Sequence, residues 1–208
     1  MTLINNIIIG FAMAFIGVLP PGLLNIYAAK VSRKEGRKKA LVFSLGVTLT
    51  VFIQTYIALL FSRYLFKHPE LIDVLQKIAL AIFIGLTVYF LFIAKDTRRE
   101  LSQEINHSKK NRFFSGIFLA ALNLLPLPYW VYISISFSSF GWFTFDKPFL
   151  LPAALASALG TFVVLAIYIW FFRAKENQKP LSVNLNKIIG IITGIIATIT
   201  LLKIISVL

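Results

Sequence analysis

Residues 7–25 read IIIGFAMAFIGVLPPGLLN, and residues 113–131 read FFSGIFLAALNLLPLPYWV. Each stretch is an apolar run with a glycine near its start. Each run is interrupted by proline at a point a little past the middle of the membrane. An offset of 106 positions pairs Gly10 with Gly116 and Pro20 with Pro126. Matches in the same order along both halves predict two copies of one unit, each built on a broken apolar helix.

The whole chain is apolar enough for six membrane spans. Of its 208 residues, 58% are hydrophobic and 14% are charged, against ~25% charged residues in an average soluble protein. The eight acidic residues all fall in connectors or at the very start of a span. About 20 apolar residues are needed to cross a hydrocarbon core. The chain has six apolar segments of about this length or longer, which are 3–29, 40–61, 78–94, 113–140, 149–172 and 185–208. We therefore expect an all-α integral membrane protein with six transmembrane helices.

Three spans in each half make an odd number, so the second copy is expected to enter the membrane from the opposite side. The two halves then form an inverted repeat, related by an axis in the membrane plane. Gly46 and Gly160 recur at an offset of 114 and support this division. It predicts a first three-helix repeat over 1–94, a cytoplasmic connector over 95–112 and a second, inverted three-helix repeat over 113–208.

Basic residues are concentrated in alternate connectors. Fifteen lie between spans one and two, three and four, or five and six, against three on the other side. The positive-inside rule places the basic connectors in the cytoplasm and both termini outside. In a soluble chain the net charge of +13 would suggest nucleic acid, but here the charge is split among short connectors, so no nucleic-acid partner is expected. The first basic residues follow the first apolar run, which favours an uncleaved helix over a signal peptide.

Each break is expected to expose backbone hydrogen-bonding groups deep in the membrane. Proline lacks an N–H, and its ring clashes with the carbonyl four residues earlier. The carbonyls that we expect to be free are those of Ile16, Gly17, Leu122 and Leu124. A new half-helix follows each break, near 22–24 and near 129–130, and begins with unpaired amides and a positive dipole end. Carbonyls suit an ammonium and amides suit a carboxylate, so the breaks predict a binding site for a small zwitterion.

The predicted substrate-binding residues lie at the two breaks and on the second span. They are Pro20, Pro21, Gly22, Asn25, Gln54, Asn123, Pro126, Pro128 and Trp130. A structural kink is the alternative for any single proline, whereas two breaks at matching depth favour a site. Asn25 and Asn123 either orient a ligand or cap the broken helices. Gln54 either lines the pathway or makes an interhelical hydrogen bond, which is the commoner role of a buried amide.

The composition excludes several kinds of active site. Cysteine is absent, and His68 and His107 fall in polar stretches, so thiol chemistry, disulfides and His/Cys metal cages are excluded and no cofactor is expected. No His, Asp or Glu lies deep inside a predicted span, which argues against a membrane-embedded enzyme. The same pattern argues against an Asp/Glu proton relay. We expect transport to be driven by the membrane potential, by the solute gradient or through an acid in a loop.

With these residues in view, the chain resembles the LysE/RhtB family of bacterial amino-acid exporters over nearly its whole length. That family has a Pro-Gly-Pro break, a basic connector with glycine and a glycine early in span two, then a glycine, an Asn-Pro and often a Trp in its second half. The matching residues are Pro21, Gly22, Gly36 and Gly46 in the first half and Gly116, Asn123 and Trp130 in the second half. Leu23 and Leu124 stand where the family has proline. The resemblance implies a multi-pass protein of the bacterial cytoplasmic membrane that exports amino acids or similar small metabolites.

The expected protein is therefore a secondary exporter that exposes a small zwitterionic solute alternately to each side of the membrane. Spans two and five are expected to pack against the spans that carry the breaks. Two alternatives stay open, a divalent-metal-ion exporter of the same broad superfamily and a non-transporting membrane scaffold. A metal exporter should carry carboxylate ligands inside the membrane, and the predicted spans have none at depth. Membrane lipid and a small-molecule substrate are the expected partners, and a homo-oligomer is left open.

Overall fold

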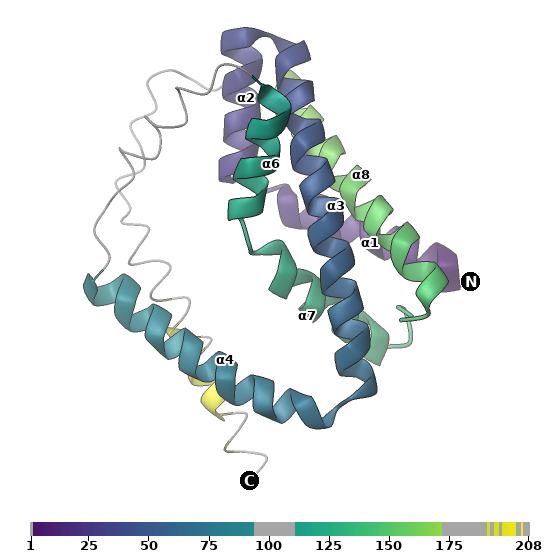
Figure 1. Cartoon of the computed structure of the whole chain (residues 1–208), viewed down its shortest axis with the longest axis vertical. Helices are drawn as coiled ribbons and strands as arrows, with labels where there is room; N and C mark the ends of the chain where they lie inside the picture. Colours follow the sequence, from purple (N-terminus) through teal and green to yellow (C-terminus); the bar gives the residue numbers. More distant parts are fainter. Residues whose placement is uncertain are drawn as a thin grey trace. The chain divides into compact units, whose positions relative to one another are not determined.

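The computed structural model describes residues 2–93 and 111–171, and beyond them residues 191, 194, 195, 197–202 and 205. Every regular element in these residues is helical, as the sequence predicts (Figure 1). The elements are α1 (Thr2–Val18), α2 (Leu23–Glu35), α3 (Arg37–Lys67), α4 (Glu70–Val88), the π-helical turn η1 (Tyr89–Ile93), α6 (Arg112–Leu122), α7 (Pro126–Ser139) and α8 (Lys147–Phe171).

The helices form two compact units. One comprises residues 1–66 and 108–176, and the other comprises residues 67–107 and 177–208. Each unit therefore takes residues from both halves of the chain. This division follows packing, so the predicted repeat boundaries at 94 and 113 stay a prediction.

Two helices of the first unit are long and apolar enough to cross a membrane by themselves. They are α3, with 31 residues, and α8, with 25 residues. At ~1.5 Å per residue both exceed the ~30 Å of a hydrocarbon core. They confirm the helices predicted over 40–61 and 149–172, and both extend a few residues beyond the predicted bounds.

Two bent helix pairs stand where the sequence predicts broken spans. α1 and α2 meet at an angle of 74°, and α6 and α7 meet at 63°. The first break, at residues 19–22, lies where it was predicted. The second lies at residues 123–125, so the prediction that Pro126 and Pro128 interrupt the helix is wrong in detail. Pro126 is instead the first residue of α7, a position whose missing N–H has no partner in any helix.

The remaining predicted spans are covered less fully. Where we expected a span over 78–94, α4 begins at Glu70, and the apolar part of α4 and η1 runs only from Leu80 to Ile93. Most of the span predicted over 185–208 lies outside the described residues, as do residue 94 and residues 95–110 of the predicted connector. By length and composition, α3 and α8 are two candidate spans, and the number rises to four of the six predicted if each bent pair counts as one span.

Glycines set the crossing of α1 with α8 in the first unit. A Cβ on Gly10 of α1 would lie 2.5 Å from the carbonyl oxygen of Ala153 on α8, and one on Gly160 of α8 would lie 2.6 Å from that of Phe11. No side chain fits at either point, so α1 and α8 touch backbone to backbone. Small residues permit this approach in membrane bundles. Span five therefore packs against the first broken span, as the sequence predicts.

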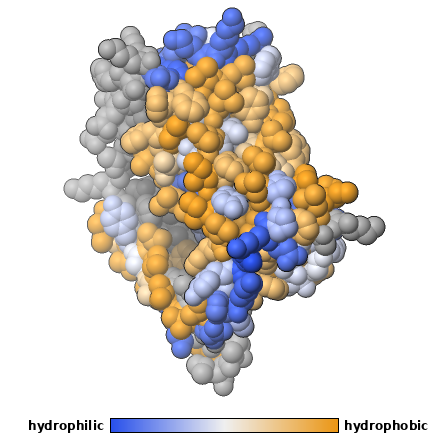
Figure 2. Space-filling model, turned by 45° about the vertical axis from the view of Figure 1, so that its right-hand side comes forward, coloured by the Kyte–Doolittle hydropathy of each residue, from blue (hydrophilic) through white to orange (hydrophobic). Residues whose placement is uncertain are grey.

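The surface of the first unit carries apolar stripes. Pairs of exposed side chains four residues apart lie on one face of a helix, as with Ile4 and Ile8 on α1 or Ile53 and Ile57 on α3. Figure 2 shows hydrophobic residues over much of the surface in that view, with hydrophilic residues at its upper end, where α2 runs into α3, and in a second patch lower down. Exposed apolar area of this extent is typical of a surface that contacts lipid or another protein.

Candidate functional site at the helix breaks

The side chain of Asn25 forms hydrogen bonds with the backbone of the first break. Asn25 is the third residue of α2 and is 2% exposed. Its side-chain nitrogen donates to the carbonyl oxygen of Val18 at 2.6 Å and to that of Pro20 at 3.0 Å. Both carbonyls belong to the interrupted segment, so Asn25 replaces donors that the broken ladder has lost. Of its two predicted roles, the capping role is confirmed.

The same contacts fix the orientation of the Asn25 amide. A nitrogen and not an oxygen must face two carbonyl oxygens, because only the nitrogen donates. Oδ1 therefore points the other way, and it is buried without a hydrogen-bond partner among the described residues. A buried acceptor in this condition costs ~1–3 kcal/mol until a donor reaches it. The first break thus keeps one strong acceptor ready for a donor group.

Two tyrosines from the second half of the chain also bind backbone near the first break. Tyr168 of α8 donates to the carbonyl oxygen of Leu19 at 2.9 Å, and Tyr129 of α7 donates to that of Met13 at 2.8 Å. Gly17 makes room for the second contact, because a Cβ there would lie 2.9 Å from the Tyr129 oxygen. Sequence reasoning did not single out either tyrosine, although a hydroxyl inside an apolar helix needs a partner.

Gln54 of α3 does at the second break what Asn25 does at the first. It is 7% exposed, and its side-chain nitrogen donates to the carbonyl oxygens of Ala120 at 3.2 Å and Asn123 at 3.0 Å. Gln54 Oε1 is then left buried without a hydrogen-bond partner. The side chain of Asn123 accepts from the amide of Leu125 at 3.4 Å, two residues further along the chain. The predicted interhelical bond of Gln54 is confirmed, and the two roles predicted for Asn123 stay predictions.

The second break does not offer the free backbone groups that were predicted there. The amide of Tyr129 donates to the carbonyl of Leu125, and the carbonyl of Leu124 accepts from the amide of Leu127. The prediction of free groups at Leu124 and Tyr129 is therefore wrong. α7 begins with a tight turn that satisfies these groups, and Pro126 and Pro128 have no amide to offer.

The start of α2 differs from the start of α7. Its N-cap, Gly22, has extended backbone, with φ −105° and ψ 175°, and no side chain caps the helix. The first-turn amides of α2 therefore remain the candidate contact for an anionic group. Pro20, Pro21 and Gly22 are exposed at this break.

Trp130 lies in the packed core beside the breaks. It is 2% exposed and packs with Ala14 of α1 and Ala58 of α3, with its ring edge-on to Tyr129 at 5.6 Å between centroids. Pro128 is exposed and Pro126 is partly buried. These contacts give Trp130 a packing role, and a direct contact of these three residues with a solute stays a prediction.

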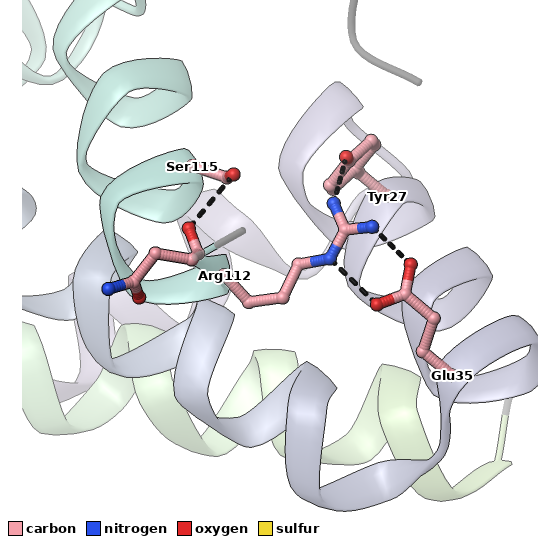
Figure 3. Close-up of polar contacts among 5 residues, drawn as sticks. Tyr27, Glu35, Arg112 and Ser115 are labelled. Atoms are coloured by element: carbon pink, nitrogen blue, oxygen red, sulfur yellow. Dashed lines mark hydrogen bonds and ion pairs between the residues drawn. The ribbon is translucent and has the colours of Figure 1, made fainter. Parts of the chain in front are cut away.

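Polar contacts also join the elements at the two ends of the first unit. Arg112 binds Glu35 and Tyr27 at one end (Figure 3), and Asn6 binds the backbone of Thr144 at the other. Sequence reasoning treated Glu35 and Arg112 only as connector charges. The available signal was that Arg112 stands directly beside an apolar segment. In the described part of the chain no group of three or more His, Cys, Asp or Glu residues could hold a metal ion.

Comparison with known proteins gives one match. A family model described as LysE type translocator matches residues 15–203. The matched residues include α3, α8, both breaks and the side chains of Asn25 and Gln54 that bond to the breaks. Neither the curated proteins nor the solved structures give a match.

Proposed function

The chain belongs to the LysE type translocator family, a family of membrane export transporters, and from this premise we propose that it exports amino acids or similar small zwitterionic metabolites. The export would proceed as secondary transport by alternating access, with the solute held at the two helix breaks. The protein would lie in the bacterial cytoplasmic membrane with both termini outside, as the distribution of basic residues favours.

One observation carries the proposal: each broken helix is capped by a buried amide whose oxygen remains free. Asn25 and Gln54 use both side-chain hydrogens on backbone carbonyls, and both oxygens lack a partner. A structural kink needs only the two donated bonds. In the proposed mechanism a transported solute passes these oxygens, which accept only from donors such as an ammonium group.

A zwitterion would meet these groups in a definite way. The ammonium would donate to the free amide oxygens, and the carboxylate would bind the uncapped amides at the start of α2. This revises the expectation from sequence, in which the ammonium would bind backbone carbonyls. The carbonyls of Val18, Leu19 and Pro20 already accept bonds from Asn25 and Tyr168.

The helix pairing supports an inverted repeat. α1 crosses α8 at Gly10 and Gly160, and α6 crosses α3 at Gly116 and Gly46. The sequence offsets pair Gly10 with Gly116 and Gly46 with Gly160. By these offsets α1 corresponds to α6 and α3 corresponds to α8, so the two crossings are equivalent contacts between the two halves. The compact units agree, since the first two predicted spans of each half lie in one unit and most of each third span lies in the other. Alternating access would then follow from interconversion of the two halves.

The test is export from proteoliposomes. Vesicles are loaded with labelled amino acids, one at a time, and efflux is measured with and without an imposed membrane potential. We expect efflux of at least one amino acid, and a rate that changes with the imposed potential would show that net charge crosses the membrane in the transport cycle. A folded protein that moves none of them would overturn the proposal.

A double variant separates an exporter from a scaffold. Pro21→Ala supplies an N–H that can extend α1, and Gly22→Ala adds a methyl group beside the first-turn amides of α2. The new Cβ at Gly22 would meet only the Pro20 oxygen, at 4.0 Å, so folding should be tolerated. We expect efflux to fall at least tenfold while membrane insertion and thermal stability are kept. Tyr132→Phe, at a side chain that is 70% exposed, is the matched control and should leave efflux unchanged.

A further inference from the structure

An ion pair closes one end of the first unit. Arg112, the first residue of α6, is 7% exposed. Its Nε donates to Glu35 Oε2 at 2.9 Å, its Nη2 binds Glu35 Oε1, and its Nη1 donates to the hydroxyl of Tyr27 at 2.9 Å (Figure 3). Glu35 ends α2, and Tyr27 lies two turns earlier in the same helix. The guanidinium therefore fastens the start of α6 to the end of α2 by a bidentate, charge-assisted contact.

A neutral contact closes the opposite end. Asn6, near the start of α1, is fully buried. Its side-chain nitrogen donates to the carbonyl oxygen of Thr144 at 2.9 Å, and its Oδ1 accepts from the amide of Thr144 at 3.1 Å. The Thr144 hydroxyl in turn donates to Asp146, directly before α8 begins. The start of α1 is thus fastened to the turn between α7 and α8.

The two contacts occupy equivalent places in the predicted repeat. Asn6 and Arg112 are 106 positions apart, and each lies four residues before the glycine of its half. Arg112 joins α6, which precedes the second break, to the end of α2, which follows the first break. Asn6 joins α1, which precedes the first break, to the turn after α7, which follows the second break. Figure 1 shows the start of α6 with the end of α2 at one end of this unit, and the start of α1 with the start of α8 at the other.

We propose that these contacts are the two gates of the transport pathway, with Arg112, Glu35 and Tyr27 as the cytoplasmic gate and Asn6 with Thr144 as the external gate. This proposal rests on the proposed export function and orientation. Each contact spans the two halves on one side of the breaks, so opening one side requires that contact to separate. Both are formed in this structure, and the free oxygens of Asn25 and Gln54 are buried, as expected when both gates are shut.

The two gates differ in chemistry, and this difference predicts which of them opens more readily. Charge-assisted hydrogen bonds are roughly twice as strong as neutral ones. The cytoplasmic gate uses three hydrogen bonds to one guanidinium, whereas the external gate uses two neutral amide bonds. The protein without solute should therefore open outward more readily than inward. Release to the outside would then be easy, and solute binding would be needed to help separate the ion pair.

Spin-label distances test the gates without any solute. The chain has no cysteine, so only introduced thiols are labelled. One pair, Lys34→Cys with Asn111→Cys, spans the cytoplasmic gate, and the other, Ile4→Cys with Lys147→Cys, spans the external gate. All four side chains are exposed. We expect Glu35→Gln to raise the long-distance population of the cytoplasmic pair about tenfold or more and to leave the external pair unchanged, and Asn6→Ala to do the reverse.

Two further variants keep the test decisive where Glu35→Gln folds poorly. Tyr27→Phe removes one hydroxyl while its ring stays against Phe43, 5.0 Å between centroids, and should open the cytoplasmic pair to a smaller extent. The exchange of Glu35→Arg with Arg112→Glu should restore part of the closed population. Unchanged distances in folded variants, or a broadening of both pairs by either substitution, would overturn the gate assignment. No solute takes part in these distance measurements. If each gate responds to its own substitution but no amino acid leaves the vesicles, the export function is rejected and the gate assignment is kept.

Discussion

Gly46 on α3 and Gly116 on α6 face each other across one helix crossing. A Cβ on Gly46 would lie 3.0 Å from the amide nitrogen of Ile117 and would overlap the carbonyl of Phe113. A Cβ on Gly116 would lie 3.0 Å from the amide nitrogen of Val47 and would overlap the carbonyl of Phe43. Each glycine thus leaves room for the backbone of the other helix. This crossing also brings Gln54 within hydrogen-bonding distance of the second break.

Gly116→Ala should therefore separate α3 from α6. The neighbouring atoms are backbone and cannot turn aside, so we expect a loss of about 1–3 kcal/mol of stability and loss of the Gln54 contacts. Thermal unfolding in detergent measures the effect. Gly85→Ala on α4 is the control, because no atom of the described residues lies within 4 Å of its new Cβ. A helical alanine there should be neutral or stabilising, and equal losses at both sites would contradict the packing argument.

Much of this crossing could be predicted from the sequence. Gly10, Gly46, Gly116 and Gly160 recur in order in both halves, and backbone contact between helices leaves few alternatives to glycine. The same holds for the first break, where Pro20 and Pro21 remove two successive amides. The family resemblance, which includes Pro21, Gly46 and Gly116 among its matching residues, is confirmed by the match over residues 15–203.

The partners of the polar side chains could not be predicted in the same way. Gln54 and Asn123 are 69 positions apart, and Tyr168 and Leu19 are 149 apart. No local pattern reports which helix faces such a side chain. Proline position also misled the prediction at the second break, because proline both ends a helix and begins one. Pro126 begins α7, and the chain turns three residues earlier, where Asn123 and Gln54 satisfy the backbone.

Gln54→Leu should test the bridge at the second break. Leucine keeps most of the volume but removes the donor to Ala120 and Asn123. Interhelical hydrogen bonds in membrane proteins contribute about 1–2 kcal/mol at most, so the variant should fold with a lower melting temperature. Efflux should fall more strongly than stability, because the proposed acceptor Oε1 is lost as well. A variant that unfolds more easily but transports at the original rate would assign Gln54 to structure alone.

Tyr168→Phe should weaken the first break with little change in packing. The hydroxyl donates to the carbonyl of Leu19, which lies between α1 and α2 and has lost its helical donor. We expect a loss of about 1 kcal/mol, because the carbonyl becomes an unpaired acceptor. Tyr132→Phe provides the comparison, since Tyr132 is exposed on α7. Equal melting temperatures for the two variants would show that the Leu19 contact contributes nothing to stability.

Gly17→Ala and Tyr129→Phe should be coupled. An alanine Cβ at Gly17 would lie 2.9 Å from the Tyr129 oxygen and 3.1 Å from the carbon that bears it. The ring must shift by a few tenths of an ångström, and the bond from Tyr129 to the carbonyl of Met13 should be lost. Tyr129→Phe loses the same bond without the shift. The double variant should therefore be more stable than the sum of the two single losses predicts, by about 0.5–1.5 kcal/mol in a double-mutant cycle of unfolding. Additive losses would mean that Gly17 does not make room for this hydroxyl, and the contact between α1 and α7 would need another explanation.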